Sequence, residues 1–151
     1  MMKCKWTSAH SLRLSRLLTL IVLLLAVAAL FCIPIITEWY DAVSEQEPIH
    51  NLLNVIFYVS DMLGILAVWE LLKMLNHIAK EKLFVDENVT CLRVISWCCF
   101  GVAAVWTPLV YFRLLAVFVA FVAAFAGLIL RVMKNLFAAA VALREENDYT
   151  I

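Results

Sequence analysis

The sequence has few of the residues that separate domains or hold cofactors. Only three glycines and three prolines occur among 151 residues, and no repeat or flexible linker interrupts the chain, so we expect a single unit. No Cys-x-x-Cys pair is present, and none of the three histidines falls inside an apolar run. Metal and haem sites need thiolate or imidazole ligands on converging positions. We therefore predict no metal ion, no cofactor and no enzymatic activity.

Charged residues are also scarce, while apolar residues exceed what a small soluble fold can bury. Charged residues make up 16% of the chain and apolar residues 66%, and the mean hydropathy is +0.96. Soluble domains contain roughly 45–50% apolar residues, so the excess must face a non-aqueous solvent. Twelve basic residues balance twelve acidic ones. Total charge therefore gives no reason to expect direct binding to nucleic acid.

Four apolar segments suit membrane-spanning helices, at about residues 17–36, 52–72, 94–109 and 114–130. The last two form one run, which as a single helix would be about 55 Å long at about 1.5 Å per residue. A bilayer needs only roughly 30 Å. Thr107-Pro108 and Arg113 divide the run, which indicates a tight helical hairpin. The predicted fold class is all-α, an integral membrane four-helix bundle.

The first apolar run follows a basic segment, as an export signal would. It is longer than the roughly 7–15 apolar residues of such a signal, so we interpret it as a retained membrane helix. Pro34 lies near its expected end, where a helix tolerates proline. Residues 37–50 are expected to connect the first two spans, with Trp39 and Tyr40 at the membrane interface.

Basic residues predict the orientation, because an excess of lysine and arginine belongs in the cytoplasm. Only Arg113 falls on the opposite side of the predicted membrane. The other eleven basic residues are Lys3, Lys5, Arg13, Arg16, Lys73, Lys80, Lys82, Arg93, Arg131, Lys134 and Arg144. Both termini are therefore predicted to be cytoplasmic, in the cell (inner) membrane. The second and fourth helices are predicted to extend into the cytoplasm, bordering a loop at residues 73–93 and a tail at residues 131–151.

The second span carries a polar stripe. Its members are spaced by three, four and three residues, which places them on one helix face: Asn51, Asn54, Tyr58 and Asp61. Asp61 would lie near mid-membrane, where an ionisable group is costly and usually faces the bundle interior. One interpretation is a polar pocket or proton-responsive carboxylate reached from outside. The other is hydrogen bonding between helices, with Asp61 protonated or paired to Arg113.

The fourth span has a face of small residues and an opposite face of aromatic ones. The small residues, which let a neighbouring helix approach closely, are Ala116, Ala120, Ala123, Ala124 and Gly127. The aromatic residues, expected to face lipid or a second subunit, are Phe118, Phe121 and Phe125. A homo-oligomer is compatible with this arrangement.

Two predicted cytoplasmic segments carry a recognisable pattern. Phe-Val-Asp-Glu-Asn-Val at residues 84–89 is followed by Leu-Arg-Val-Ile at residues 92–95, and the chain ends in Leu-Arg-Glu-Glu-Asn-Asp-Tyr-Thr-Ile. With four spans, the chain resembles the bacterial membrane family catalogued as domain of unknown function 2975. Members of that family are often encoded beside a small helix-turn-helix regulator. The resemblance thus implies a membrane-bound partner of a transcription regulator.

The leading functional hypothesis is a regulatory or sensory protein that binds a protein partner through its cytoplasmic loop and tail. The candidate partner-binding residues are Phe84, Asn88, Arg93, Glu145, Glu146, Asp148 and Ile151. The tail also has an apolar stretch at residues 132–143, which would pack on the second helix, lie on the membrane or receive another protein. The alternative function is a small transporter, or an accessory subunit of one, that uses the intramembrane carboxylate of Asp61.

Overall fold

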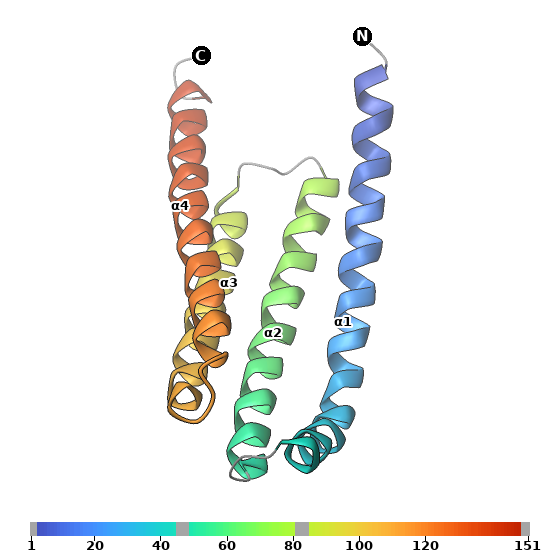
Figure 1. Cartoon of the computed structure of the whole chain (residues 1–151). Coiled ribbons are helices and arrows are strands. Elements are labelled where there is room, and N and C mark those ends of the chain that lie inside the picture. Colours follow the sequence, from blue (N-terminus) through green and yellow to red (C-terminus); the bar gives the residue numbers. More distant parts are fainter. Residues whose placement is uncertain (1–2, 45–48, 81–84, 149–151) are drawn as a thin grey trace.

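The computed structural model describes residues 3–44, 49–80 and 85–148 and has four long helices in chain order. They are α1 (Lys3–Val43), α2 (His50–Ala79), α3 (Asp86–Trp106) and α4 (Ala116–Asp148), and the short 3₁₀ helix η1 (Thr107–Tyr111) joins the last two (Figure 1). The described residues contain no strand. The all-α fold class is confirmed.

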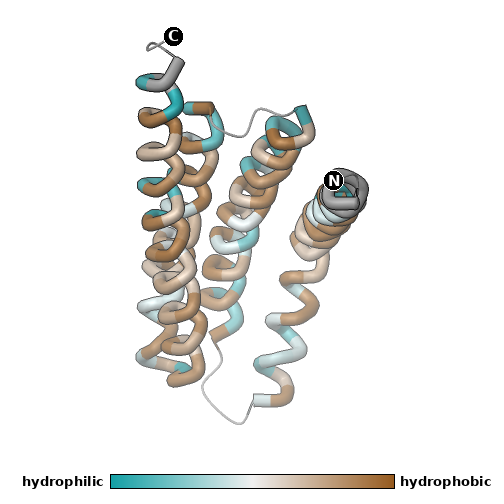
Figure 2. The backbone as a smooth tube through the Cα atoms, turned by 90° about the horizontal axis from the view of Figure 1, so that it is seen from above, coloured by the Kyte–Doolittle hydropathy of each residue, from teal (hydrophilic) through white to brown (hydrophobic). Residues whose placement is uncertain are grey.

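All four helices are long and apolar enough to cross a membrane. The candidate spans are Ser11–Val43, His50–Ala79, Asp86–Tyr111 and Ala116–Arg144. Hydrophobic residues make up most of each helix, and hydrophilic residues occur at the helix ends and also partway along α2 and α4 (Figure 2). The prediction of a multi-pass membrane protein with four spanning helices is confirmed.

The helices pack as neighbours in chain order, α1 on α2, α2 on α3 and α3 on α4. Within the described residues, α1 and α4 do not pack along their lengths, so the bundle is open between them. The start of α1, the end of α2, the start of α3 and the end of α4 lie at one end of the bundle, which we call the terminal end (Figure 1). The end of α1, the start of α2 and η1 lie at the other end, which we call the hairpin end (Figure 1).

Helix α1 differs from the prediction near Pro34. The sequence indicated a helix end close to residue 36, whereas α1 continues to Val43 with Pro34 inside it. Membrane helices tolerate proline where serine or threonine side chains supply further hydrogen bonds to the backbone. Thr37 contacts the backbone beside the proline, since its Oγ1 lies 3.1 Å from the carbonyl oxygen of Ile33 and 3.0 Å from that of Pro34. The helix bends in its last turns instead of ending (Figure 1).

One cluster of buried hydrophobic residues lies at the hairpin end, and further buried residues lie along α3. Ile49, Leu53 and Ile56 from the start of α2 meet Leu109 of η1 and Ala116 of α4. Tyr40, Phe57 and Trp106 are among the partly buried residues around this cluster. Trp106 also donates from Nε1 to Ser60 Oγ at 2.9 Å, which ties α3 to α2. The hairpin end is therefore where three helices and η1 are held in register.

Candidate functional site

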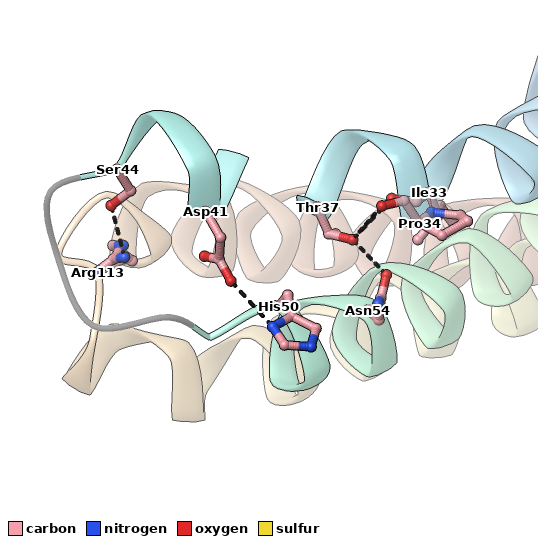
Figure 3. A network of polar contacts seen from close by, with 8 residues as sticks. All are labelled: Ile33, Pro34, Thr37, Asp41, Ser44, His50, Asn54 and Arg113. Atoms are coloured by element: carbon pink, nitrogen blue, oxygen red, sulfur yellow. Dashed lines mark hydrogen bonds and ion pairs between the residues drawn. The ribbon is translucent and has the colours of Figure 1, made fainter. Parts of the chain in front are cut away.

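A set of polar contacts joins α1, α2 and the α3–α4 connection at the hairpin end (Figure 3). Arg113 Nε donates to the hydroxyl of Tyr40 at 3.0 Å, and Nη2 donates to Ser44 Oγ at 3.1 Å. The guanidinium carbon also lies 5.6 Å from the centre of the Tyr40 ring, within range of a cation–π interaction. Arg113 thus links the last turns of α1 to the connection between η1 and α4.

The second contact of this group lies deeper, between α1 and α2. Thr37 is completely buried, and its Oγ1 lies 2.6 Å from Asn54 Oδ1 (Figure 3). A hydroxyl group has one proton, so Asn54 and the two backbone carbonyls of α1 share it as acceptors. Such interhelical contacts join membrane helices, because an unsatisfied polar group in hydrocarbon is costly.

Asp41 and His50 form the third contact. The distance between Asp41 Oδ2 and His50 Nδ1 is 3.5 Å. The Asp41 side chain is only 11% exposed, and both carboxylate oxygens are buried without a hydrogen-bond partner, whereas His50 is 48% exposed. A protonated imidazole would turn this contact into an ion pair across the α1–α2 connection.

The polar stripe of α2 is only partly drawn into these contacts. Asn54 bonds to Thr37, while Asn51 is exposed and Tyr58 is 39% exposed. Asp61 is half-buried, and its Oδ2 is buried without a hydrogen-bond partner. The structure therefore brings one member of the stripe, Asn54, onto α1.

Several residues of the hairpin-end contacts were not identified from the sequence. Thr37, Tyr40, Asp41 and Ser44 lie in a segment that the sequence assigned to a connection, so their common face was missed. Thr37 lies three and four residues before Tyr40 and Asp41, and Ser44 lies four and three residues after them, which is the signal that would have found them once α1 is taken to continue past Pro34.

The small face of α4 lies against α3. Gly127 is buried and Ala116 is buried, and Ala120 and Ala124 are partly buried. Ser96 Oγ of α3 donates to the carbonyl oxygen of Gly127 at 2.9 Å. A Cβ atom added at Gly127 would lie 3.2 Å from Cys99 Cβ and 3.2 Å from the carbonyl oxygen of Ser96. The opposite face is exposed, with Phe118 at 68%, Phe121 at 66% and Phe125 at 54%.

Two charged contacts lie towards the terminal end. Lys73 Nζ donates to Glu70 Oε1 at 2.6 Å on α2, and the thiol of Cys91 on α3 also approaches that carboxylate. The Arg131 guanidinium of α4 lies 5.2 Å from the centre of the Trp97 ring on α3. We call Glu70, Lys73 and Arg131 the charged band. Charged residues beside an aromatic residue such as Trp97 are typical of a membrane–water boundary.

The described part of the chain contains no group of three or more His, Cys, Asp or Glu side chains that could hold a metal ion. Comparison with family models matches residues 9–151 to "Protein of unknown function (DUF2975)". The chain belongs to the DUF2975 family. The resemblance noted in the sequence is thereby confirmed. Neither curated proteins nor solved structures include a match to this chain.

The DUF2975 match covers both segments that carried the resemblance, and the structure places their residues differently. Asn88 is 1% exposed, and its Oδ1 lies 3.1 Å from His77 Nδ1, so it joins the end of α2 to the start of α3. Arg93 and Glu146 are exposed. Glu145 and Asp148 lie on α4, with only their backbone described. Phe84 and Ile151 lie outside the described residues.

Proposed function

We propose that this DUF2975 protein is a regulatory membrane protein that binds a cytoplasmic protein through the projecting part of α4. The single observation that carries the proposal is an exposed apolar face on α4 beyond the charged band at Arg131 and Lys73. Members of the DUF2975 family are often encoded beside a small helix-turn-helix regulator, which favours a transcription regulator as the partner. Such a protein would be held at the membrane or released from it.

The projecting part of α4 consists of residues 132–148, the last seventeen residues of that helix. At about 1.5 Å per residue this segment is about 25 Å long. Helices α1 and α4 both extend past the ends of α2 and α3 at the terminal end (Figure 1). A partner that approaches this end would therefore meet α4 before it meets the end of α2 or the start of α3.

One face of this segment is apolar and uncovered. Val132 is 53% exposed, Leu136 is 61% exposed and Leu143 is 62% exposed. Their spacing of four and seven residues puts the three side chains on one side of the helix. This exposure argues against packing on α2. Contiguous apolar surface of this kind in water is typical of a protein–protein or membrane contact.

A protein partner explains the apolar face better than the membrane surface does. For residues 132–148 to lie flat on the bilayer, α4 would have to bend sharply near Arg131. Sharp bends arise almost always at proline, at glycine or at an irregular turn. The segment contains neither proline nor glycine, and α4 is α-helical from Ala116 to Asp148.

The distribution of basic residues supports a cytoplasmic location for the terminal end. Lys73 and Arg131 lie towards this end, and Arg13 and Arg16 lie in the first half of α1. Arg113, at the hairpin end, is the exception. Positive segments resist translocation, so the terminal end stays on the side where the protein is made.

Deletion of residues 145–151 is expected to abolish recovery of the partner. The acidic end of α4 borders the apolar face and supplies the charge that orients a partner. The measurement is affinity purification in mild detergent followed by mass spectrometry, comparing the full chain with the truncated one. Circular dichroism of both proteins serves as the control for helix content. Recovery of every co-purifying protein by the truncated chain would rule out this role for the tail.

One observation favours a second candidate function, a small transporter or an accessory subunit of one. Asp61 lies inside a spanning helix, and its buried Oδ2 lacks a hydrogen-bond partner. Intramembrane carboxylates in that situation often carry protons. If this function holds, Asp61→Asn abolishes proton-coupled flux in proteoliposomes and leaves protein abundance unchanged. Lost assembly in the variant would instead mark Asp61 as a structural residue.

A further inference from the structure

We propose that the hairpin end of α1 and α4 binds an anionic lipid of the outer leaflet. The lipid phosphate would lie at Arg113, and part of one acyl chain would occupy the apolar cavity beside it. This inference concerns the end of the bundle opposite the proposed partner site and does not depend on that function.

Two adjoining cavities at the hairpin end have a shape that suits a lipid. One has a volume of about 210 Å³ and lies among apolar side chains that include Ile36 of α1, Phe57 of α2 and Val119 of α4. The other has a volume of about 860 Å³, is more open and is lined by residues that include Trp39. Arg113, Tyr40 and Leu115 line both. The pair therefore consists of an apolar cavity with a cationic mouth.

Charge and position favour an anion at that mouth. Arg113 is the only lysine or arginine in residues 17–72 and 94–130. Its hydrogen bonds to Tyr40 and Ser44 hold the guanidinium at the border of the two cavities. A guanidinium is planar and matches the oxygens of a phosphate. Trp39, 65% exposed, is the type of residue that lies at headgroup depth in a bilayer.

The open side of the bundle favours a lipid over a soluble phosphate. Because α1 and α4 do not pack along their lengths, the apolar cavity can be entered from the bilayer between them. Ile36 is 51% exposed and Val119 is 39% exposed, and both line this cavity. A soluble phosphate would use Arg113 and leave the apolar cavity empty, whereas a lipid uses both.

The test is native mass spectrometry of the full chain released from vesicles of equal parts phosphatidylcholine and phosphatidylglycerol. The wild-type protein is expected to retain phosphatidylglycerol preferentially. Val119→Phe fills the apolar cavity without touching the hydrogen bonds of Arg113, and it is expected to reduce the retained phosphatidylglycerol to the level of phosphatidylcholine. Val117, on the same helix, is 41% exposed and lines neither cavity, so Val117→Phe is the matched control and should behave like wild type.

Arg113→Gln tests the charge separately. The preference for phosphatidylglycerol over phosphatidylcholine should fall about tenfold, as expected when one charge-assisted contact is lost. Soluble glycerol phosphate should not displace the lipid. Equal retention of the two lipids by the wild type, unchanged retention by Val119→Phe, or displacement by glycerol phosphate would each overturn the proposal.

Discussion

Gly127→Val is expected to push α4 away from α3 and to lower the free energy of unfolding by about 1–3 kcal/mol. A Cβ atom at this position would already lie 3.2 Å from Cys99 Cβ, 3.2 Å from the Ser96 carbonyl oxygen and 3.3 Å from Phe100 Cε1. The Ser96 oxygen belongs to the helix backbone and cannot rotate away. The same displacement would weaken the hydrogen bond from Ser96 Oγ to Gly127.

Gly64→Val is the matched control, since within the described residues a Cβ added there has no atom within 4 Å apart from its chain neighbours and the backbone of its own helix. It is expected to change the free energy of unfolding by no more than about 0.5 kcal/mol. The measurement is unfolding of each purified variant in mixed micelles, followed by circular dichroism. Equal destabilisation by the two substitutions would show that α3 and α4 do not depend on the close approach at Gly127.

The double substitution Leu136→Glu and Leu143→Glu is expected to reduce partner binding about a hundredfold or more while the protein still inserts and folds. Both leucines lie at the surface of the projecting part of α4, so their loss removes little internal packing. At a protein interface, however, two carboxylates would replace central apolar contacts. An unpaired charge buried in an interface costs about 3–5 kcal/mol, and about 1.4 kcal/mol corresponds to tenfold in affinity.

The control for this prediction keeps the apolar character of the face. Leu136→Met with Leu143→Met is expected to retain the partner, because the volume and hydropathy change little. The measurement is the amount of partner recovered with each tagged variant, normalised to the variant itself. Equal recovery by the glutamate and methionine pairs would exclude this face as the interface.

Features that depend on local sequence were predictable. Hydropathy and length located four spanning helices, and Thr107-Pro108 with Arg113 located the turn between α3 and α4, where η1 is found. The predicted end of α1, near residue 36, was wrong because proline ends most helices in water. Helix α1 continues past Pro34 because a non-helical backbone near hydrocarbon would leave its N–H and C=O groups without hydrogen bonds.

The residues of the site were harder to predict, because spacing gives the face of a helix and not its neighbour. The stripe on α2 was predicted from its periodicity, but only the fold shows that Asn54 meets Thr37 of α1. The partners of Arg113 are about seventy residues away in the chain, at Tyr40 and Ser44. Asn88 is polar and in a predicted loop, yet it is buried because α2 and α3 converge on it.

Site-specific photo-crosslinking in the cell membrane tests the proposed partner site most directly. A photoreactive amino acid placed at Leu136 would report on the projecting face, and one at Phe118 would report on the exposed aromatic face nearer the hairpin end of the same helix. A discrete protein adduct at Leu136 but not at Phe118 is the predicted result. Adducts with lipid alone at Leu136 would contradict it, because they would place this segment on the membrane surface.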